Sequence, residues 1–500
     1  MSSRGLIKSM LVTGGAQVVS IVISIIRMKV LALLLGPSGI GLFSLFNSLK
    51  DIVAGTAGLG MGSSSVRQIA SDRENAQELS RVRRVLLAAH LVQGSIAMLG
   101  VWLLRQPISV WLMGDDTYAT EVGLVGIAVL LTLMSVAQTA LLRGLRRIAD
   151  LGRVTVLGAL VATVTGLSAV WMFGQAGLIW FLLAQPLGTV LVALYFTRRL
   201  PPPTTDRPSL PELWRVWKPM AKLGSVFMLG GLATPATLLL VRSWINRDLG
   251  LDAAGQFAAA WGISMTYVGF LLTAMAADYY PRLTEVIRDR DATTRLMNDQ
   301  SQLGLAIGGP VLLLLIGLAP WVIQLLYSDA FQPAVALLQW QTVGNVFKLA
   351  SWPLAFAFAA SGRSKVFLLT EISWNLVFIG LFWLGLGFFG LKIAGFAFLA
   401  AYVLYLGTVA FIVRRLHGFR WERLSVQLMG THAVLAFALL ALSLSLPLAG
   451  AVASVVLALV TGLAGLRVVV QKIGSEGRLA SRIARLYTRI GWPVETKDDE

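Results

Sequence analysis

The chain contains no cysteine among its 500 residues, which excludes disulfides, thiol chemistry and thiolate metal sites. It has only three histidines, His90, His417 and His432, and they lie far apart in the sequence, so we expect no metal site. No Gly-x-x-x-x-Gly-Lys-Ser/Thr loop and no His-Glu-x-x-His pair occurs, which argues against ATP hydrolysis and zinc-dependent catalysis. These absences predict a protein that is not an enzyme and that needs no cofactor.

Charged residues are also scarce. They make up 13% of the chain, whereas soluble proteins carry about 25%. Hydrophobic residues make up 56%, and the mean hydropathy is +0.74. Many apolar runs reach about 20 residues, the length of helix that crosses about 30 Å of hydrocarbon. Because the runs are continuous rather than alternating, they predict an all-α polytopic membrane protein and not a β-barrel.

The apolar runs predict about fourteen membrane-spanning helices, with a Pro-rich link that divides the first twelve into two groups of six. The predicted spans cover residues 9–34, 39–62, 85–104, 121–142, 154–173, 178–197, 223–244, 255–277, 303–326, 334–360, 366–390, 393–413, 431–449 and 451–470. The link combines Pro201–Pro203 with an amphipathic segment, Leu210–Met220, that we expect to lie in the membrane interface.

The spans and the link predict five regions along the chain. These are an N-terminal lobe (1–200), a cytoplasmic Pro-rich and amphipathic linker (201–222), a C-terminal lobe (223–415), two additional spans (416–471) and a basic cytoplasmic tail (472–500).

The distribution of basic residues predicts the topology. Lys and Arg number 42 against 25 Asp and Glu, and about 33 of the 42 fall in every second connection or at the termini. By the positive-inside rule, these connections and both termini are cytoplasmic. Attraction to anionic lipid headgroups also accounts for the net charge of +17, so no nucleic-acid partner is expected.

Two halves of the chain resemble each other at a nearly constant spacing. Residues 35–43 can be laid on residues 249–257, where one Leu, two Gly and one Phe coincide, and the same spacing brings Asp115 onto Asp329. A spacing four residues longer brings Gly144 onto Gly362, each at a basic cytoplasmic turn. Because each half holds an even number of spans, these matches predict a parallel repeat about an axis along the membrane normal.

Some charged and polar residues lie inside the predicted spans, where an ionised side chain costs about 3 kcal/mol or more unless it faces a cavity or a partner. These residues are Arg27, Lys29, Asn47, Lys50, Asp51, Arg242, Asn345, Lys348, Glu371 and Asn375. Each also has a structural interpretation. The outermost basic side chains could extend to the headgroups, Lys50 or Asp51 could pair with another span, Lys348 could neutralise Glu371, and the Asn side chains could join helices by hydrogen bonds.

Considered together, the deep charges are mostly basic and are divided between the two halves. A cavity between the halves would be cationic, and its low dielectric would strengthen the attraction for an anion. Arg binds phosphate oxygens through a fork of donors and Lys through a point charge. We therefore predict an anionic cargo, such as a phosphate or pyrophosphate. The residues predicted to bind it are Lys29, Arg242, Lys348, Lys50 and Arg27, with Asn47, Asp51, Asn345 and Glu371 as polar or coupling residues of the cavity.

Several segments between about residues 5 and 415 resemble the polysaccharide flippases of the Wzx type, in order and at matching spacings. They are Leu35–Gly41 after a first span bearing Lys29, Val66-Arg67, Pro235 with Arg242, Pro281, Leu326–Asp329 followed by Trp340–Lys348, and Glu371. The match is nearest to the O-antigen and enterobacterial-common-antigen (lipid III) translocases of the multidrug/oligosaccharidyl-lipid/polysaccharide exporter superfamily. Asn47 and Asn345 depart from the family pattern, because relatives carry Arg and Asp there.

The resemblance implies two six-helix lobes around a V-shaped central cavity, with two extra C-terminal helices outside the resemblance. It implies an undecaprenyl-pyrophosphate-linked oligosaccharide as cargo, moved by alternating access from the cytoplasmic to the periplasmic face of a bacterial inner membrane. Polymerases and glycosyltransferases of lipopolysaccharide or exopolysaccharide assembly are the implied partners. Lys29, Arg242, Lys348 and Arg67 stand where family members carry basic residues, and Arg67 is expected at the cytoplasmic gate.

Two other classes of function remain open from the sequence. A cation-coupled multidrug exporter of the same superfamily would need an acidic cavity, whereas the buried charges here are mainly basic. A membrane enzyme or polymerase of glycan assembly would need paired acids on a sizeable outer loop, and every predicted outer link is short. A lipid-linked oligosaccharide flippase is therefore the expected function.

Overall fold

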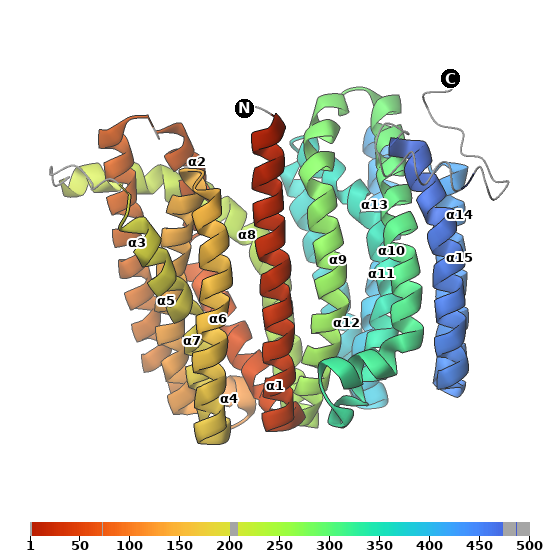
Figure 1. The fold of residues 1–500 in the computed structure, drawn as a ribbon, viewed down its shortest axis with the longest axis horizontal. Coiled ribbons are helices and arrows are strands. Elements are labelled where there is room, and N and C mark those ends of the chain that lie inside the picture. Colours follow the sequence, from red (N-terminus) through yellow and green to blue (C-terminus); the bar gives the residue numbers. More distant parts are fainter. Residues whose placement is uncertain (1–2, 73, 201–208, 474–486, 488–500) are drawn as a thin grey trace. The chain divides into compact units, whose positions relative to one another are not determined.

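A computed structural model describes residues 3–72, 74–200, 209–473 and 487. Every regular element in these residues is helical, and 11 helical segments are long and apolar enough to cross a membrane (Figure 1). The chain is therefore an all-α, polytopic membrane protein, as the sequence predicted. The helices are α1 (Ser3–Ala57), α2 (Met61–Ser71), α3 (Ala76–Leu103), α4 (Arg105–Met113), α5 (Ala119–Gly144), α6 (Ile148–Phe173), α7 (Leu178–Thr197), α8 (Leu210–Leu249), α9 (Leu251–Val286), α10 (Arg290–Leu326), α11 (Ala334–Ala360), α12 (Ser364–Phe389), α13 (Ile393–His417), α14 (Arg423–Ser445) and α15 (Pro447–Ile473), with short 3₁₀ helices η1 (Gly174–Gly177), η2 (Asp329–Phe331) and η3 (Gly390–Lys392).

Three of the 11 segments are interrupted at predicted outer links. Within α1, Gly36 has a φ of 63° and a ψ of −164°, which are not helical angles, and Pro37 follows it. The turn η1 separates α6 from α7, and η3 separates α12 from α13. A glycine at positive φ reverses the chain at each of these points without the steric cost that a Cβ would add.

Two compact units make up the fold. Unit 1 comprises the chain up to Gln256 together with Leu326–Ala330, and unit 2 comprises Phe257–Leu325 and the residues from Phe331 onward. In unit 1, α2, α3, α5, α6, α7 and α8 contribute to one apolar core. In unit 2, α9, α10, α11, α13 and α14 contribute to another, so α14 is part of the packing of this unit.

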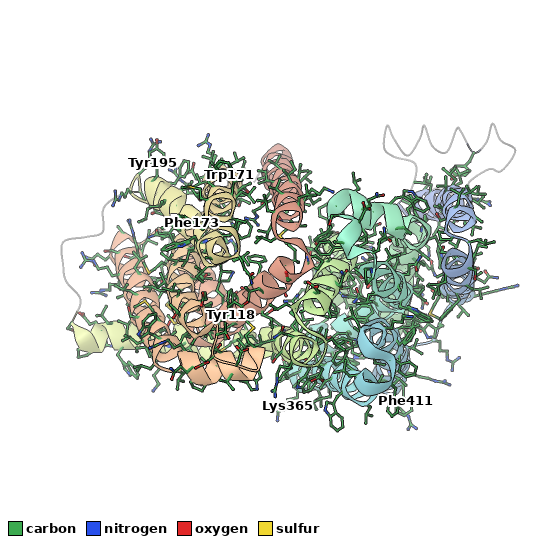
Figure 2. All side chains as sticks on the ribbon, turned by 90° about the horizontal axis from the view of Figure 1, so that it is seen from below. Tyr118, Trp171, Phe173, Tyr195, Lys365 and Phe411 are labelled. Atoms are coloured by element: carbon green, nitrogen blue, oxygen red, sulfur yellow. The ribbon has the colours of Figure 1, made fainter. Side chains whose placement is uncertain are left out.

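Large apolar side chains also cover the outside of each unit. Trp171 is 77% exposed, and Figure 2 shows it, with Phe173 and Tyr195, on the outer side of unit 1. Phe411 on α13 is exposed on unit 2. Exposed apolar surface on this scale would favour aggregation in water, whereas a bilayer covers it with acyl chains.

Several helices extend beyond the predicted spans, because hydropathy detects only their apolar parts. The largest difference is α8. It joins the predicted interfacial segment and the predicted seventh span in one helix that contains Pro219 and Pro235. A capping box between Ser209 and Glu212 begins this helix. Of the predicted linker, residues 201–208 lie outside the described residues, and so does the predicted tail except for its first two residues and residue 487.

The similarity between the two halves extends to backbone angles. Gly250 has a φ of 87° and a ψ of 171°, close to the angles of Gly36 at the predicted equivalent position. The turns predicted to be cytoplasmic correspond differently from the predicted Gly144–Gly362 pair. Arg146, with a φ of 56°, has the left-handed conformation of Gly362, with a φ of 72°. Arg146, and not Gly144, is therefore the structural equivalent of Gly362. The turn requires a positive φ at this position, and Arg146 adopts it although it is not a glycine.

Gly41 and Gly255 occupy equivalent positions of the matched segments and lie together where α1 crosses the start of α9. A methyl group on Gly41 would collide with the carbonyl oxygen of Leu251, and one on Gly255 would collide with the carbonyl oxygen of Pro37. Two helix backbones approach this closely only where neither carries a side chain. The close crossing therefore requires glycine on both helices.

We expect Gly255→Ala to lower the free energy of unfolding by about 1–3 kcal/mol, because the colliding atoms belong to the backbone and cannot rotate away. The matched control is Gly230→Ala on α8, where nothing lies within 4 Å of the added carbon. There alanine should be neutral or stabilise the helix by up to about 1 kcal/mol. Thermal unfolding in detergent measures both effects, and equal melting temperatures for the two variants would contradict the tight crossing.

The start of α14 and the end of α15 are connected to α10 by polar contacts. Asn298 accepts hydrogen bonds from the Glu422 backbone N–H at 3.0 Å and from the Ser425 hydroxyl at 2.7 Å. Gln302 donates to the Glu422 carboxylate at 2.9 Å. Lys472 on α15 forms an ion pair with Asp299. The two C-terminal helices are therefore anchored to unit 2 by specific hydrogen bonds as well as by apolar packing.

Candidate functional site

In unit 1, the second half of α1 presents a polar face to α8. Ser44, Asn47, Ser48 and Asp51 recur at intervals of three and four residues, so they share one side of the helix. Arg242 on α8 donates to the Ser48 hydroxyl and, at 3.4 Å, to the Ser44 carbonyl oxygen. The structure thus brings the predicted Arg242 to the same place as the predicted polar residues of α1.

The charges of this cluster do not cancel. Lys50 lies 3.3 Å from the Asp51 carboxylate and donates to Asn47 at 2.8 Å, while Asn47 donates to Asp51 at 3.0 Å. Asp51 also attracts Arg242 through space, but Arg242 forms no ion pair in the described part of the chain. Its Nε is buried and has no hydrogen-bond partner among those residues. Two positive charges and one negative charge leave the cluster with a net positive charge.

Arg27 and Lys29 project from α1 on nearly opposite sides, because two residues turn a helix by about 200°. Arg27 donates to the Gln185 side chain on α7, and its guanidinium lies 5.7 Å from the centroid of the Phe181 ring. Lys29 donates to the carbonyl oxygen of Tyr327, directly after the end of α10. Burial raises the pKa of Tyr327 to about 12, so its phenol stays neutral.

The contact of Lys29 has a counterpart elsewhere in unit 1. Ser243 follows Lys29 by the spacing of the repeat, and its hydroxyl donates to the carbonyl oxygen of Trp111 at 3.0 Å, near the end of α4. In both places a side chain from a long helix donates to the last carbonyl groups of another helix, which otherwise lack partners. Lys29 therefore has a structural role in α1, before the interruption at Gly36, in addition to its predicted role in binding.

In unit 2, Lys348 on α11 is the deeply placed basic residue. Its Nζ lies 3.2 Å from the Met265 sulfur and 5.3 Å from the centroid of the Tyr402 ring, a cation–π geometry. Glu371 on α12 accepts a hydrogen bond from the Tyr405 hydroxyl at 2.6 Å. Glu371 attracts Lys348 through space, but in the described part of the chain Lys348 forms no ion pair. Lys348 and Glu371 therefore interact through space, without a direct ion pair between them in this part of the chain.

The remaining predicted residues have local contacts. Asn345 is fully buried and donates to the Ser264 hydroxyl on α9 at 2.8 Å, so it joins two helices. Asn375 donates to the backbone carbonyl of Glu371 at 2.8 Å. The side-chain oxygens of both asparagines are buried and have no partner among the described residues. Arg67 is exposed on α2, on the opposite side from the buried Ile69.

Sequence reasoning missed the neighbours that hold these charges. They are Ser44 and Ser48 in unit 1, and Met265, Tyr402 and Tyr405 in unit 2. The serines stand four residues apart and the tyrosines three apart, so each pair shares a helix face. That spacing was the available signal, but it does not tell which other helix the face meets.

Comparisons with known proteins place the chain among transport proteins. The lipid III flippase of Escherichia coli (strain K12) is 24% identical over 80% of this chain and 96% of its own length, and that of Shigella flexneri matches equally. Among solved structures, the lipid II flippase MurJ in an inward closed conformation matches with a TM-score of 0.67 at 12% identity, over 92% of this chain and 100% of that one. An inward-facing multidrug resistance MATE family transporter of the MOP superfamily matches with a TM-score of 0.65 at 16% identity, over 79% and 95% of the two chains.

The likeness to solved structures establishes a MATE- and MurJ-like fold, and transporters rather than enzymes share it. A family profile described as "Polysaccharide biosynthesis protein" matches residues 30–336, more than half of the chain. The matched range includes Arg242 and the polar face of α1. The chain therefore belongs to the polysaccharide biosynthesis protein family.

Proposed function

We propose that the protein is a lipid-linked oligosaccharide flippase of the bacterial inner membrane. Its cargo is an undecaprenyl-pyrophosphate-linked glycan unit, which it moves from the cytoplasmic to the periplasmic face. The observation that carries the proposal is that each unit holds a deep basic residue, Arg242 or Lys348, without an ion-pair partner in the described chain. A buried cation without a paired acid is costly, and an anionic cargo would supply the missing charge.

The matched relatives support the same cargo class. The alignment with the lipid III flippase covers almost the whole length of that protein, and the lipid II flippase has the same fold as this chain. Both names refer to flippases that act on a lipid, so the proposal assigns this chain a cargo with an apolar tail. Arg242 would bind phosphate oxygens through its fork of donors, and Lys348 through a point charge.

The proposed mechanism is alternating access between two six-helix lobes, 1–200 and 223–415, which form a parallel pseudo-repeat around a V-shaped central cavity. Both termini are cytoplasmic, and the linker (201–222), the two additional helices (416–471) and the tail (472–500) lie outside the lobes. Lys29, Lys50 and Arg27 assist in holding the pyrophosphate, Arg67 acts at the cytoplasmic gate, and Asn47, Asp51, Asn345 and Glu371 line the cavity. Polymerases and glycosyltransferases of the same pathway supply and consume the cargo.

The experiment that tests the proposal measures on which face of the membrane the lipid-linked glycan lies. Cells depleted of the protein should accumulate single lipid-linked units in the cytoplasmic leaflet, where a membrane-impermeant glycan-modifying reagent added to spheroplasts cannot reach them. Re-expression should make the units accessible. Depletion of the polymerase serves as the control, because it should leave accessible, unpolymerised units. Accessible units in cells without the protein would refute the flippase assignment.

A multidrug exporter of the same superfamily is the second candidate, since a MATE transporter shares the fold. Such an exporter would bind cationic drugs, which the net positive charge of the Arg242 cluster disfavours. Drug sensitivity unchanged by depletion, together with loss of glycan display, separates the two candidates.

A further inference from the structure

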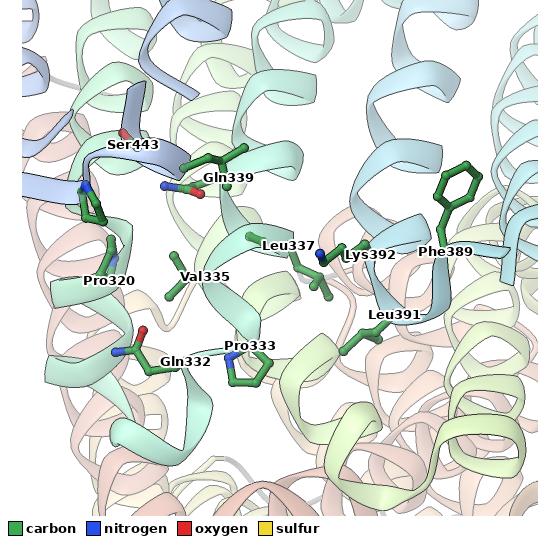
Figure 3. Close-up of a pocket in the computed structure, with 13 residues that line it drawn as sticks. Pro320, Gln332, Pro333, Val335, Leu337, Gln339, Phe389, Leu391, Lys392 and Ser443 are labelled. Carbon is green, nitrogen blue, oxygen red and sulfur yellow. The ribbon is translucent and has the colours of Figure 1, made fainter. Parts of the chain in front are cut away.

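A pocket of about 550 Å³ opens in unit 2, away from the Lys348 cluster (Figure 3). Its wall is formed by the first turns of α11, the turn η3, the end of α14 and the start of α15, with Pro320 of α10 at one side. These chain segments are the ones that the positive-inside rule assigns to the outer face. The pocket therefore lies at the level of the outer headgroups, and its volume falls within the range of small-molecule sites, about 300–1,000 Å³.

The lining of the pocket is apolar with a few polar groups. Phe389, Leu337 and Pro333 supply apolar wall, and Lys392 is its one charged residue. Figure 3 shows the nitrogen end of Lys392 pointing toward Leu337 and thus toward the other lining residues. Ser443 also lines the pocket. It is only 4% exposed, and its hydroxyl is buried against Gly450 of α15, so Lys392 is the charged group that a ligand in the pocket would meet.

The backbone conformation of the turn η3 does not require a lysine at position 392. The same turn occurs in unit 1, where Gly174 has a φ of 58° and a ψ of −133°, against 53° and −140° for Gly390. Phe173 and Phe389 precede the two glycines, and the position of Lys392 is occupied by Ala176 in unit 1. Since alanine serves equally well in this backbone, the lysine is not needed for the turn. It is also a basic residue on the side of the membrane where such residues are few.

We propose that this pocket binds an anionic phospholipid of the outer leaflet, with the headgroup phosphate at Lys392 and an acyl chain along the apolar wall. One cation matches the single negative charge of a phosphodiester, whereas a pyrophosphate carries more charge than this lining compensates. The site does not depend on the proposed cargo. It gives the junction of α14 and α15 a role that the transport cycle of the lobes does not require.

Native mass spectrometry of the purified full-length protein tests the site, with phosphatidylglycerol, phosphatidylethanolamine and farnesyl pyrophosphate as probes. Wild-type protein should retain one phosphatidylglycerol in preference to phosphatidylethanolamine, whereas farnesyl pyrophosphate, which the proposed cargo site can also bind, reports on the pocket only through its response to Lys392→Gln. Lys392→Gln should reduce this retention about fivefold, because one lysine near a lipid phosphate contributes a factor of that size. Lys392→Arg should restore it.

The matched control is Arg105→Gln, which removes another basic residue from the predicted outer side, in unit 1 and not among the residues that line the pocket. It should leave retention of phosphatidylglycerol unchanged. Equal retention of phosphatidylglycerol in wild type and Lys392→Gln, equal losses in Lys392→Gln and Arg105→Gln, or a larger loss of farnesyl pyrophosphate than of phosphatidylglycerol in Lys392→Gln would each overturn the proposal. These readouts do not use transport, so the site can fail while the proposed function stands.

Discussion

Replacing Arg242 with alanine is expected to reduce glycan display about 100-fold while the protein remains folded, because one charge-assisted hydrogen bond contributes roughly 3 kcal/mol. The guanidinium is the part of its cluster without an ion pair in the described chain. Its removal leaves the Ser48 hydroxyl satisfied, since that group also donates to the Ser44 carbonyl at 2.8 Å. Immunoblots of glycan display, normalised to the amount of protein in the membrane, measure the loss.

Two further variants show whether the effect depends on the guanidinium group and on its position. Arg242→Lys keeps the charge and loses the fork of donors, so display should be intermediate. Arg247→Ala removes an exposed arginine from the same helix, a little more than one turn away, and should have no effect. Normal display in Arg242→Ala, or an equal loss in Arg247→Ala, would mean that the α1–α8 cluster does not bind the cargo.

Replacing Lys348 with methionine should reduce glycan display by a factor similar to that expected for Arg242→Ala. The melting temperature of the variant should be unchanged or higher. The ammonium is in contact with the Met265 sulfur and the Tyr402 ring rather than with an acid. A methionine can keep most of the apolar contact of the lysine stem, and it removes the cost of a buried cation. Loss of transport without loss of stability is the result expected for a residue that binds the cargo, and not for a residue that only stabilises the fold.

The control for Lys348→Met is Lys365→Gln, an exposed lysine near the start of α12 in the same unit (Figure 2). It should change neither display nor stability. A lower melting temperature in Lys348→Met would indicate that the through-space attraction between Lys348 and Glu371 stabilises the fold. Normal transport in that variant would remove Lys348 from the proposed site.

The membrane fold follows from the sequence because each span must satisfy its own backbone hydrogen bonds in lipid. Hydropathy therefore locates the apolar part of each membrane-spanning helix, and the distribution of Lys and Arg predicts the orientation of these helices. The sequence pattern could not predict that α8 continues through Pro219 from the predicted interfacial segment into the predicted span. Helix propensity treats a proline inside a segment as a helix end. Neighbouring helices can satisfy the backbone groups that a proline leaves free in a membrane.

The candidate site is predictable only in part, for a different physical reason. A basic residue in an apolar span indicates that a partner or a cavity exists, but sequence does not specify which helix lies opposite. Arg27 and Arg242 look alike in the sequence, yet Arg27 contacts Gln185 and Phe181 whereas Arg242 contacts the serines of α1. Only the packing of the helices distinguishes them.

Gly41 and Gly255 contact each other from equivalent positions of two similar segments, which is the geometry of an isologous dimer interface. A half-length ancestor with one such glycine would pair with a second copy of itself through the same surface. Duplication and fusion would then turn an intermolecular contact into an intramolecular one and free each copy to diverge. The two glycines relate the two segments by a local two-fold axis, because each meets the backbone of the other segment at the matching position.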